Sequence, residues 1–333
     1  MTDWVDSIAA LEACIGKTPP PVHLKVIDHI DPLAMRWIAA SPCLFTGVAG
    51  ARGMSITLGG GTPGFVRAEP GLLTIPTDAL DDPAVARPGD SFCSLFLLPG
   101  IGETLRVNGR VAACDAASIT VAVEECYAHC AKALIRSEFW KAQPRDIASD
   151  DPTAFIAASR FMALATVDAA GAADLSPKGD PEGDMVHLAD GRLWFAERPG
   201  NRRADSLRNI VAQPRVVAIL LVPGATHIVR LCGTARPSAD AGIRAGFAVR
   251  DKVPALATCI DDLDLELQPS AALARAQLWP LGDIPDLDAA KLFVAHLKIN
   301  KDKGLQAKLI GAAVSIPGLM RKGLDKDYDT NLY

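Results

Sequence analysis

Several features are missing from this sequence, and each absence narrows what the protein can be. No two cysteines have the CxxC spacing, and Cys126 and Cys130 have no matching His or Cys cluster that would complete a zinc site. We therefore expect the eight cysteines to be buried, reduced thiols that hold no metal. Thiols of this kind imply a reducing compartment.

The sequence also has no segment that would direct it to a membrane. Residues 1–6 are acidic and contain no basic stretch, so a signal peptide is not expected. The longest apolar run, residues 216–222, ends at Pro223-Gly224 and falls far short of the ~20 residues that a spanning helix needs. These observations predict a soluble, cytoplasmic protein without a membrane partner.

Positive charge is not in excess either. The 34 Lys and Arg residues and the 39 Asp and Glu residues give a formal net charge of −5. Because general nucleic-acid binding requires a basic face that displaces counterions, this composition excludes it but allows a local basic pocket for one phosphate. With 333 residues, 49% of them hydrophobic, the chain is long enough for two domains with their own cores.

A repeat at one fixed spacing is the most informative feature that is present. Two segments share an apolar run, a Pro-Gly pair, an arginine and a glycine in the same order, and every matched pair is 124 positions apart. This indicates a duplicated domain. The matched positions are Pro99 with Pro223, Arg106 with Arg230, and Gly109 with Gly233.

The predicted elements repeat in the same way. Short runs rich in Val, Ile, Leu and Thr, separated by Gly and Pro, are typical of an antiparallel barrel or sandwich. Helical spacing and proline positions predict helices over 3–14, 32–40, 128–140, 201–212, 270–278 and 286–297, with an inserted helix and loop in 238–256. Predicted strands cover 43–49, 53–58, 65–68, 71–76, 91–98, 103–113 and 118–126, then 161–167, 172–176, 184–188, 191–196, 215–222, 226–236 and 258–267.

Two polar segments of the second copy point to a phosphate. Ser176-Pro177-Lys178 follows a predicted strand, and a Pro-Gly turn then leads to Asn201 as the expected N-cap of a helix. Arg202 and Arg203 fall in the first turn of that helix, where the helix dipole disfavours cations. A bound phosphate would explain them, because helix N-termini and guanidinium groups both bind phosphate. A solvated helix start with an Asp205–Arg208 pair explains them equally well.

The stretch from Phe161 to Arg236 resembles the pyridoxamine 5′-phosphate oxidase-like flavoproteins, which are FMN-binding split barrels. The first half resembles the same family in the strings 99–110 and 129–134. The resemblance implies a mainly β fold with flanking helices, in which two barrels pair and FMN lies between them. A lysine near the flavin ring and a basic pair at the phosphate would here be Lys178 and Arg202-Arg203.

The two copies differ at the positions that would hold FMN. Opposite Ser176-Pro177-Lys178 we place Gly59-Gly60-Gly61, and opposite the basic helix start lies the acidic segment 77–82, which would repel a phosphate. Opposite His129 and Lys132 the second copy has residues 269–273, which lack both. We therefore expect two tandem split barrels that form a pseudo-dimer and share one FMN.

Each candidate residue has an expected role at the FMN site. Arg202 and Arg203 would bind the phosphate, together with Ser176, Asn201 and Ser206. Lys178 would stabilise negative charge at the ring edge. His129 would donate to the flavin or substrate and move a proton, or it would simply cap a helix, and Lys132 would flank the ring.

The expected organisation of the chain has four parts. They are an N-terminal helical extension (1–41), barrel 1 (42–142), barrel 2 (153–279) and a C-terminal helical tail (280–333).

The sequence thus predicts an FMN-dependent oxidoreductase that acts on a small molecule with an electron donor or acceptor, as a monomeric pseudo-dimer or a homodimer. True pyridoxamine phosphate oxidase activity is not expected, because no second phosphate site is evident for the substrate. Three alternatives remain: a non-catalytic flavin-binding or sensor module, a haem-binding or haem-degrading barrel with His129 or His187 as axial ligand, and a deazaflavin protein.

Overall fold

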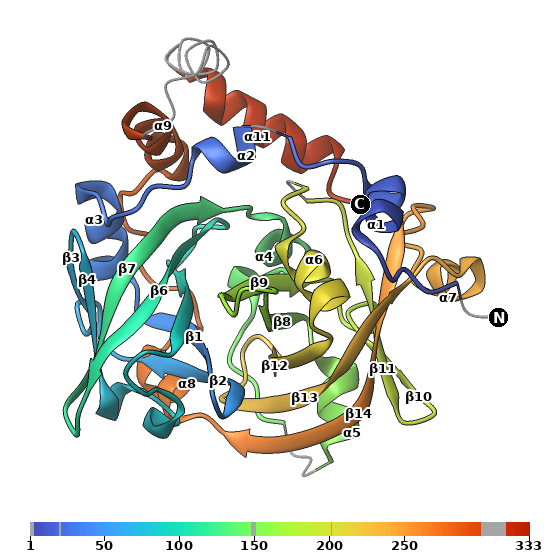
Figure 1. The fold of residues 1–333 in the computed structure, drawn as a ribbon, viewed down its shortest axis with the longest axis horizontal. Coiled ribbons are helices and arrows are strands. Elements are labelled where there is room, and N and C mark those ends of the chain that lie inside the picture. Colours follow the sequence, from blue (N-terminus) through green and yellow to red (C-terminus); the bar gives the residue numbers. More distant parts are fainter. Residues whose placement is uncertain (1–2, 20, 148–150, 201, 301–317) are drawn as a thin grey trace.

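Two seven-stranded antiparallel sheets form most of the molecule (Figure 1). The computed structural model describes residues 3–19, 21–147, 151–200, 202–300 and 318–333. The first sheet has the strand order β2-β1-β5-β6-β7-β4-β3, and the second has β9-β8-β12-β13-β14-β11-β10. Each strand of the first sheet therefore has a counterpart seven strands later in the chain. The predicted mainly β fold with two tandem copies is confirmed.

The observed strands agree with the predicted ones to within a few residues in most cases. Those of the first sheet are β1 (Cys43–Gly50), β2 (Gly53–Gly60), β3 (Arg67–Glu69), β4 (Leu72–Pro76), β5 (Ser91–Leu97), β6 (Thr104–Cys114) and β7 (Ser118–His129). Those of the second are β8 (Phe161–Val167), β9 (Ala173–Gly179), β10 (His187–Ala189), β11 (Arg192–Glu197), β12 (Arg215–Leu221), β13 (His227–Ser238) and β14 (Leu256–Pro269).

Helices lie before, between and after the sheets, and side-chain caps mark where many of them begin. Ser7, Asp31, Ser270 and Asp288 each accept a hydrogen bond from a backbone N–H of the first turn that follows. The helices include α1 (Ile8–Ile15), α2 (Pro21–Leu24), α3 (Pro32–Ala40), α4 (Lys132–Arg136), α5 (Pro152–Ala158), α6 (Asp205–Ala212), α7 (Ala241–Ala245), α8 (Ala271–Ala276), α9 (Ala289–Ile299) and α11 (Leu319–Thr330).

Three apolar clusters hold the sheets together. Each sheet has a core of its own, centred on residues such as Trp37 and Phe92 in the first half and Phe155 and Phe195 in the second. A third cluster takes side chains from both halves and contains the Phe45–Phe161 ring pair, with centroids 5.7 Å apart. Since the residues of this shared cluster are as fully buried as those of the other two, the halves form one body.

The contact between the halves is close to two-fold symmetric. Helix α4 of the first half packs on β9, and α8 of the second half packs on β2. Arg136 of α4 donates to the carbonyl of Gly179 (2.8 Å), and Arg275 of α8 donates to the carbonyl of Gly60 (3.0 Å). A Cβ at either glycine would lie about 2 Å from a helix carbonyl, at 2.1 and 1.9 Å respectively. Both positions therefore require glycine.

The strand registers correct our alignment of the two copies. In the second half Phe161 pairs with Gly179, and in the first half Cys43 pairs with Gly60. Gly60 is therefore the counterpart of Gly179, and Ser176-Pro177-Lys178 correspond to Thr57-Leu58-Gly59 instead of Gly59-Gly60-Gly61. The displacement arose because Ser176 to Gly179 belong to strand β9 and not to a turn after it. Proline is tolerated there because β9 is an edge strand.

Two predicted helices begin later than expected. Strand β7 continues to His129, so the predicted helix 128–140 shrinks to α4 and ends where Glu138 adopts a left-handed φ of 47°. The predicted helix 201–212 begins only at Asp205, because Arg202 and Ala204 have left-handed φ values of 57° and 56°. Left-handed φ values are incompatible with a right-handed helix, so these two residues prevent the helix from beginning earlier.

The terminal extensions pack on both halves. Helix α1 contacts the second half through Leu11 and Leu207, whereas α3 closes the core of the first half through Trp37 and Ile38. Helix α9 joins that same core through Leu292. Helix α11 then runs across the top of the molecule and brings the last residues next to α1 (Figure 1). The extensions are thus part of the fold rather than appendages.

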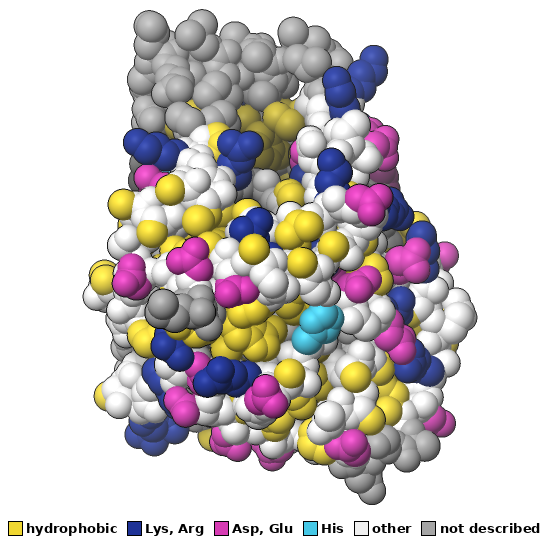
Figure 2. Space-filling view, turned by 90° about the vertical axis from the view of Figure 1, so that its right-hand side faces the viewer, with side chains coloured by type: hydrophobic (Ala, Val, Ile, Leu, Met, Phe, Trp, Pro, Cys, Tyr) yellow, Lys and Arg dark blue, Asp and Glu magenta, His cyan; other side chains and the backbone are white. Residues whose placement is uncertain are grey.

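The surface of the protein carries charges of both signs. On the face shown in Figure 2, Lys and Arg side chains alternate with Asp and Glu. None of the helices in the described residues has the length and apolarity needed to cross a bilayer.

The cysteines are free thiols, but Cys14 is exposed, so the prediction that all eight are buried is wrong. Cys14 lies on the short amphipathic helix α1, which buries mainly Leu11.

We expect Gly60→Ala to destabilise the protein, because the new methyl group would overlap the carbonyl oxygen of Ala272. Overpacking of this kind costs about 1–3 kcal/mol. Gly71→Ala is the matched control, since a Cβ there meets no atom within 4 Å. Urea unfolding followed by circular dichroism measures both. Equal stability of the two variants would contradict the close packing of α8 on β2.

Candidate functional site

A cavity of about 550 Å³ lies between the two halves, at the N-terminal end of α4. Its walls come from the end of β7 and from α4 in the first half, and from β9, the end of β11 and the start of α6 in the second. Residues 252–255, helix α1 and the C-terminal segment complete them. Seven of the eight predicted site residues line it: His129, Lys132, Ser176, Lys178, Arg202, Arg203 and Ser206. Asn201 lies outside the described residues.

Strand β9 presents Ser176 and Lys178 at the cavity. Residues two apart on a strand point to the same side, which explains why both line the same wall. Lys178 Nζ donates to Glu197 Oε2 (2.7 Å) on β11 and to Ser206 Oγ (3.3 Å) on α6. The lysine is therefore held among three elements.

The start of α6 carries the two arginines at one side of the cavity. Because they precede the helix, our placement of Arg202 and Arg203 in its first turn is wrong. Arg202 is exposed, whereas the guanidinium of Arg203 lies 4.5 Å from the centre of the Tyr127 ring and contacts Asp205. The predicted Asp205–Arg208 pair is also absent, since Arg208 bonds to Glu12 of α1 (2.8 Å).

The first half contributes His129 and Lys132. His129 is the last residue of β7, so its expected role as a helix cap is wrong. Its Nδ1 is buried and has no hydrogen-bond partner among the described residues. Burial, reinforced by nearby cations that include Arg106 and Lys25, holds the pKa of His129 well below its usual range. His129 is therefore neutral at pH 7.

Arg106 is a residue whose role the sequence did not reveal. It is fully buried and donates to Tyr127 Oη (2.7 Å), to the Asp174 carboxylate and to the Leu175 carbonyl. These contacts connect β6 of the first half with β9 of the second, directly behind the cavity. Its counterpart Arg230 is half-exposed and lies 3.8 Å from Asp82, so the two matched arginines do not have the same structural role.

Two further arginines, which the sequence did not indicate as site residues, line the cavity. Arg198 Nε donates to Asp180 (2.7 Å), and Arg136 Nε lies 3.5 Å from the same carboxyl group. Burial raises the pKa of Asp180 to about 6 in spite of these two cations. Arg198 Nη2 is buried and has no hydrogen-bond partner among the described residues. The signal available in the sequence was the Glu-Arg-Pro-Gly string at the end of β11.

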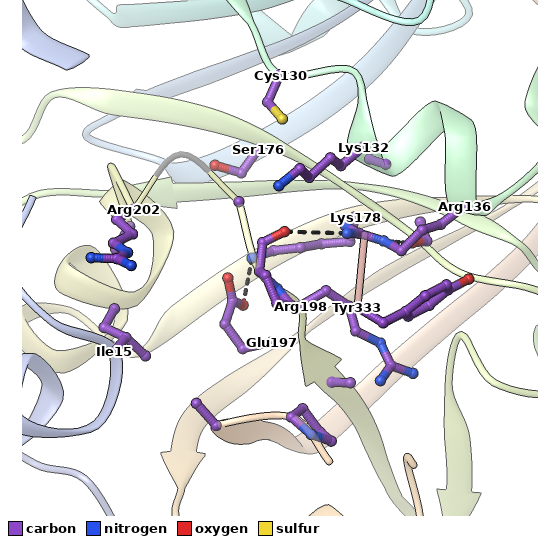
Figure 3. Close-up of a pocket in the computed structure, with 18 of the residues that line it drawn as sticks. Ile15, Cys130, Lys132, Arg136, Ser176, Lys178, Glu197, Arg198, Arg202 and Tyr333 are labelled. Atoms are coloured by element: carbon purple, nitrogen blue, oxygen red, sulfur yellow. Dashed lines mark hydrogen bonds and ion pairs between the residues drawn. The ribbon is translucent and has the colours of Figure 1, made fainter. Parts of the chain in front are cut away.

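The C-terminal segment forms one side of the cavity, opposite Arg202 (Figure 3). Asp327 pairs with the buried Lys132 at 2.8 Å, and the Leu332 carbonyl accepts from Arg136 (2.9 Å). The ring of Tyr333 lies 5.5 Å from the guanidinium of Arg198. Periodicity could not reveal these contacts, because they join residues 135 to 196 positions apart.

The equivalent place at α8 is already filled by the protein's own carboxylate. Asp81 accepts hydrogen bonds from Ser270 Oγ (2.5 Å) and from the backbone N–H of Ala272 (2.8 Å). An acidic side chain therefore occupies the helix N-terminus in the degenerate half, where an anion would be favoured. In the other half, the N-terminal end of α4 opens into the cavity.

Lys25 is a further cation near this site that the sequence did not indicate. It is 4% exposed and lies behind the cavity on the N-terminal extension, with Nζ 5.7 Å from the centre of the Tyr127 ring. Burial, with help from Arg203 and Arg106, lowers the pKa of Lys25 to about 8, although the neighbouring Cys130 acts in the opposite direction. No described residue forms an ion pair with Lys25.

The family model for pyridoxamine 5′-phosphate oxidase matches residues 148–275. The second half of the chain is therefore similar to this family. The match covers β8 to β14, α6 and most of α8, so it includes every predicted phosphate-binding residue of the pyridoxamine 5′-phosphate oxidase-like half. The first half lies outside the match, but its sheet has the same strand order.

Solved structures similar to this chain each cover about one third of it. HupZ of Group A Streptococcus is 19% identical, covers 34% of this chain and 88% of its own, and has a TM-score of 0.28. The General Stress Protein 26 from Bacillus anthracis str. Sterne is 16% identical, with coverages of 35% and 94% and a TM-score of 0.27. An F420 reductase is 16% identical, with coverages of 38% and 97% and a TM-score of 0.25. No curated protein sequence matches the chain.

We expect Lys25→Met to change how stability depends on pH. From about pH 8 to pH 10.5 the unfolded chain retains a proton that the folded chain has released, so the Lys25 contribution to stability improves as pH rises through this window. Lys25→Met removes that slope and raises the free energy of unfolding at pH 7. Urea unfolding at several pH values measures it, with the exposed Lys322→Met as control. The same slope in wild type and Lys25→Met would refute the assignment.

Proposed function

We propose that this protein is an FMN-dependent oxidoreductase of the pyridoxamine 5′-phosphate oxidase-like class that binds one FMN in the cavity between its halves. The main support is an asymmetry within a nearly symmetric interface. The cavity at α4 is lined by cations of both halves, whereas the equivalent place at α8 is filled by Asp81. A single flavin site per chain follows from this difference.

The residues present fit a flavin nucleotide. A volume of about 550 Å³ lies within the range of pockets that enclose cofactors. Arg202, which would bind the phosphate, lies at one side of the cavity, and Tyr333 lies at the opposite side (Figure 3). Two buried nitrogen atoms, His129 Nδ1 and Arg198 Nη2, have no partner among the described residues, so both can bond to a ligand.

The chain's own groups would perform three tasks. FMN, when bound, would supply reversible transfer of electrons or hydride. Arg202 and Arg203 would bind the phosphate, with Ser176 and Ser206 as hydroxyl donors. Lys178, held by Glu197, would place a positive charge at the edge of the ring where negative charge develops. Neutral His129 would act as a hydrogen-bond donor or acceptor and would not carry a charge at pH 7.

Haem binding is the second candidate, and one observation bears on it. His129 lines the cavity, but His187 stacks on Phe247 with ring centroids 4.1 Å apart, away from the cavity wall. Of the two histidines considered as axial ligands, only His129 therefore lines the cavity. A flavin-binding module without turnover differs from the enzyme only in whether a substrate reduces or oxidises the bound flavin.

We expect the protein purified with its natural cofactor to carry one FMN per chain, visible as bands at about 375 and 450 nm. Mass spectrometry of the released cofactor and its molar ratio to protein measure this. Two equivalents per chain would contradict the single site at α4. A Soret band in place of the flavin bands would favour the haem alternative.

We expect the double variant Arg202→Ala, Arg203→Ala to lose its preference for FMN over riboflavin. Each lost charged hydrogen bond to phosphate typically weakens binding by about 1.5–3 kcal/mol. Titration of the apoprotein with both flavins, monitored by fluorescence, measures the preference. The control removes two exposed arginines outside the cavity, Arg87→Ala with Arg215→Ala. An unchanged preference in the double variant would contradict the phosphate assignment.

A further inference from the structure

The C-terminal segment, residues 327–333, satisfies three cations of the cavity. The Asp327 carboxylate pairs with Lys132, the Leu332 carbonyl accepts from Arg136, and the Tyr333 ring covers Arg198. Lys132 is 2% exposed, so its charge depends on Asp327 for neutralisation, whereas Arg136, 8% exposed, also lies 3.5 Å from the Asp180 carboxyl group.

The segment is held mainly by hydrogen bonds, ion pairs and ring–cation contacts. No residue from 318 to 333 whose burial is described is buried, so α11 and the residues after it contribute little to the apolar cores. Helix α11 is attached by polar contacts, such as Tyr328 Oη to Glu103 (3.0 Å) and Arg321 to Asp288 (2.8 Å). Segments with few buried apolar contacts open at low free energy, which makes this one displaceable.

The set of groups that the segment places in the cavity resembles a ligand. It consists of a carboxylate, a carbonyl oxygen and an aromatic ring, each against a different cation of one cluster. A small molecule with an anionic group and a flat aromatic part would meet the same three cations. Asp327 and such a ligand cannot share Lys132 without placing two negative charges side by side.

We propose that residues 327–333 are an internal, displaceable occupant of the cavity that competes with anionic aromatic ligands. Docking of the segment reduces the fraction of molecules that is competent to bind, and the apparent dissociation constant rises by the same factor. Weakening the docked state therefore tightens ligand binding. The proposal adds regulation to the cavity of the proposed function, so its test includes a probe that is not a flavin.

The test compares two single substitutions on α11 that remove the same charge. Asp327→Asn removes the partner of Lys132, and Asp329→Asn removes an exposed carboxylate two residues further on. Titration with FMN should show about 3- to 10-fold tighter binding by Asp327→Asn, since half-exposed ion pairs contribute modestly, and no change for Asp329→Asn. Tyr333→Ala should tighten binding in the same direction.

Hydrogen–deuterium exchange of the unmodified full-length protein is the second measurement. Inorganic phosphate, and separately FMN, should accelerate exchange in residues 319–333, because both displace the segment. Slower exchange with either probe would identify a lid that closes over the ligand, and unchanged exchange would leave the segment uninvolved; each result overturns the proposal. If FMN does not bind while phosphate accelerates exchange, the proposed flavin function fails and the competition stands.

Discussion

The contact of each half's helix with the other half's edge strand is the constraint on which the rest of this structure depends. Helix α4 packs closely on β9, and α8 packs closely on β2, because Gly179 and Gly60 have no Cβ that would overlap a carbonyl oxygen of the helix. The arginines at the ends of these helices then bind the glycine carbonyls. This arrangement brings the N-terminal end of one half's helix to the polar strand of the other, and so a cavity with walls from both halves results.

The symmetric frame carries an asymmetric distribution of charge. At α8 the helix N-terminus is satisfied by Asp81 and Ser270, which are neighbours only because the halves are paired. At α4 the corresponding space holds cations from both halves, and Arg106 secures the interface behind them. A duplicated chain needs no second functional site, so one copy is free to replace its ligand contacts by internal hydrogen bonds.

The electrostatics of the cavity also explain why its residues are neutralised so thoroughly by their neighbours. Lys178 is paired with Glu197, Arg198 with Asp180, Arg203 with Asp205 and Lys132 with Asp327. Buried cations without partners are costly, so a cluster of this size is stable only with carboxylates or an anionic ligand beside it. Lys25 has no such carboxylate partner among the described residues, and burial lowers its pKa.

Local sequence determined the strands, several helix starts and the duplication, because these depend on period-two patterns, capping residues and a repeat that each act over a few positions. It also indicated Lys178, Ser176 and the arginine pair, since they form short strings. It did not reveal Arg136, Arg198, Asp327 or Tyr333 as neighbours, nor that Asp81 caps α8. Those contacts join residues far apart in the chain, and only the packing of the two halves and of the terminal helix brings their charges within reach of one another.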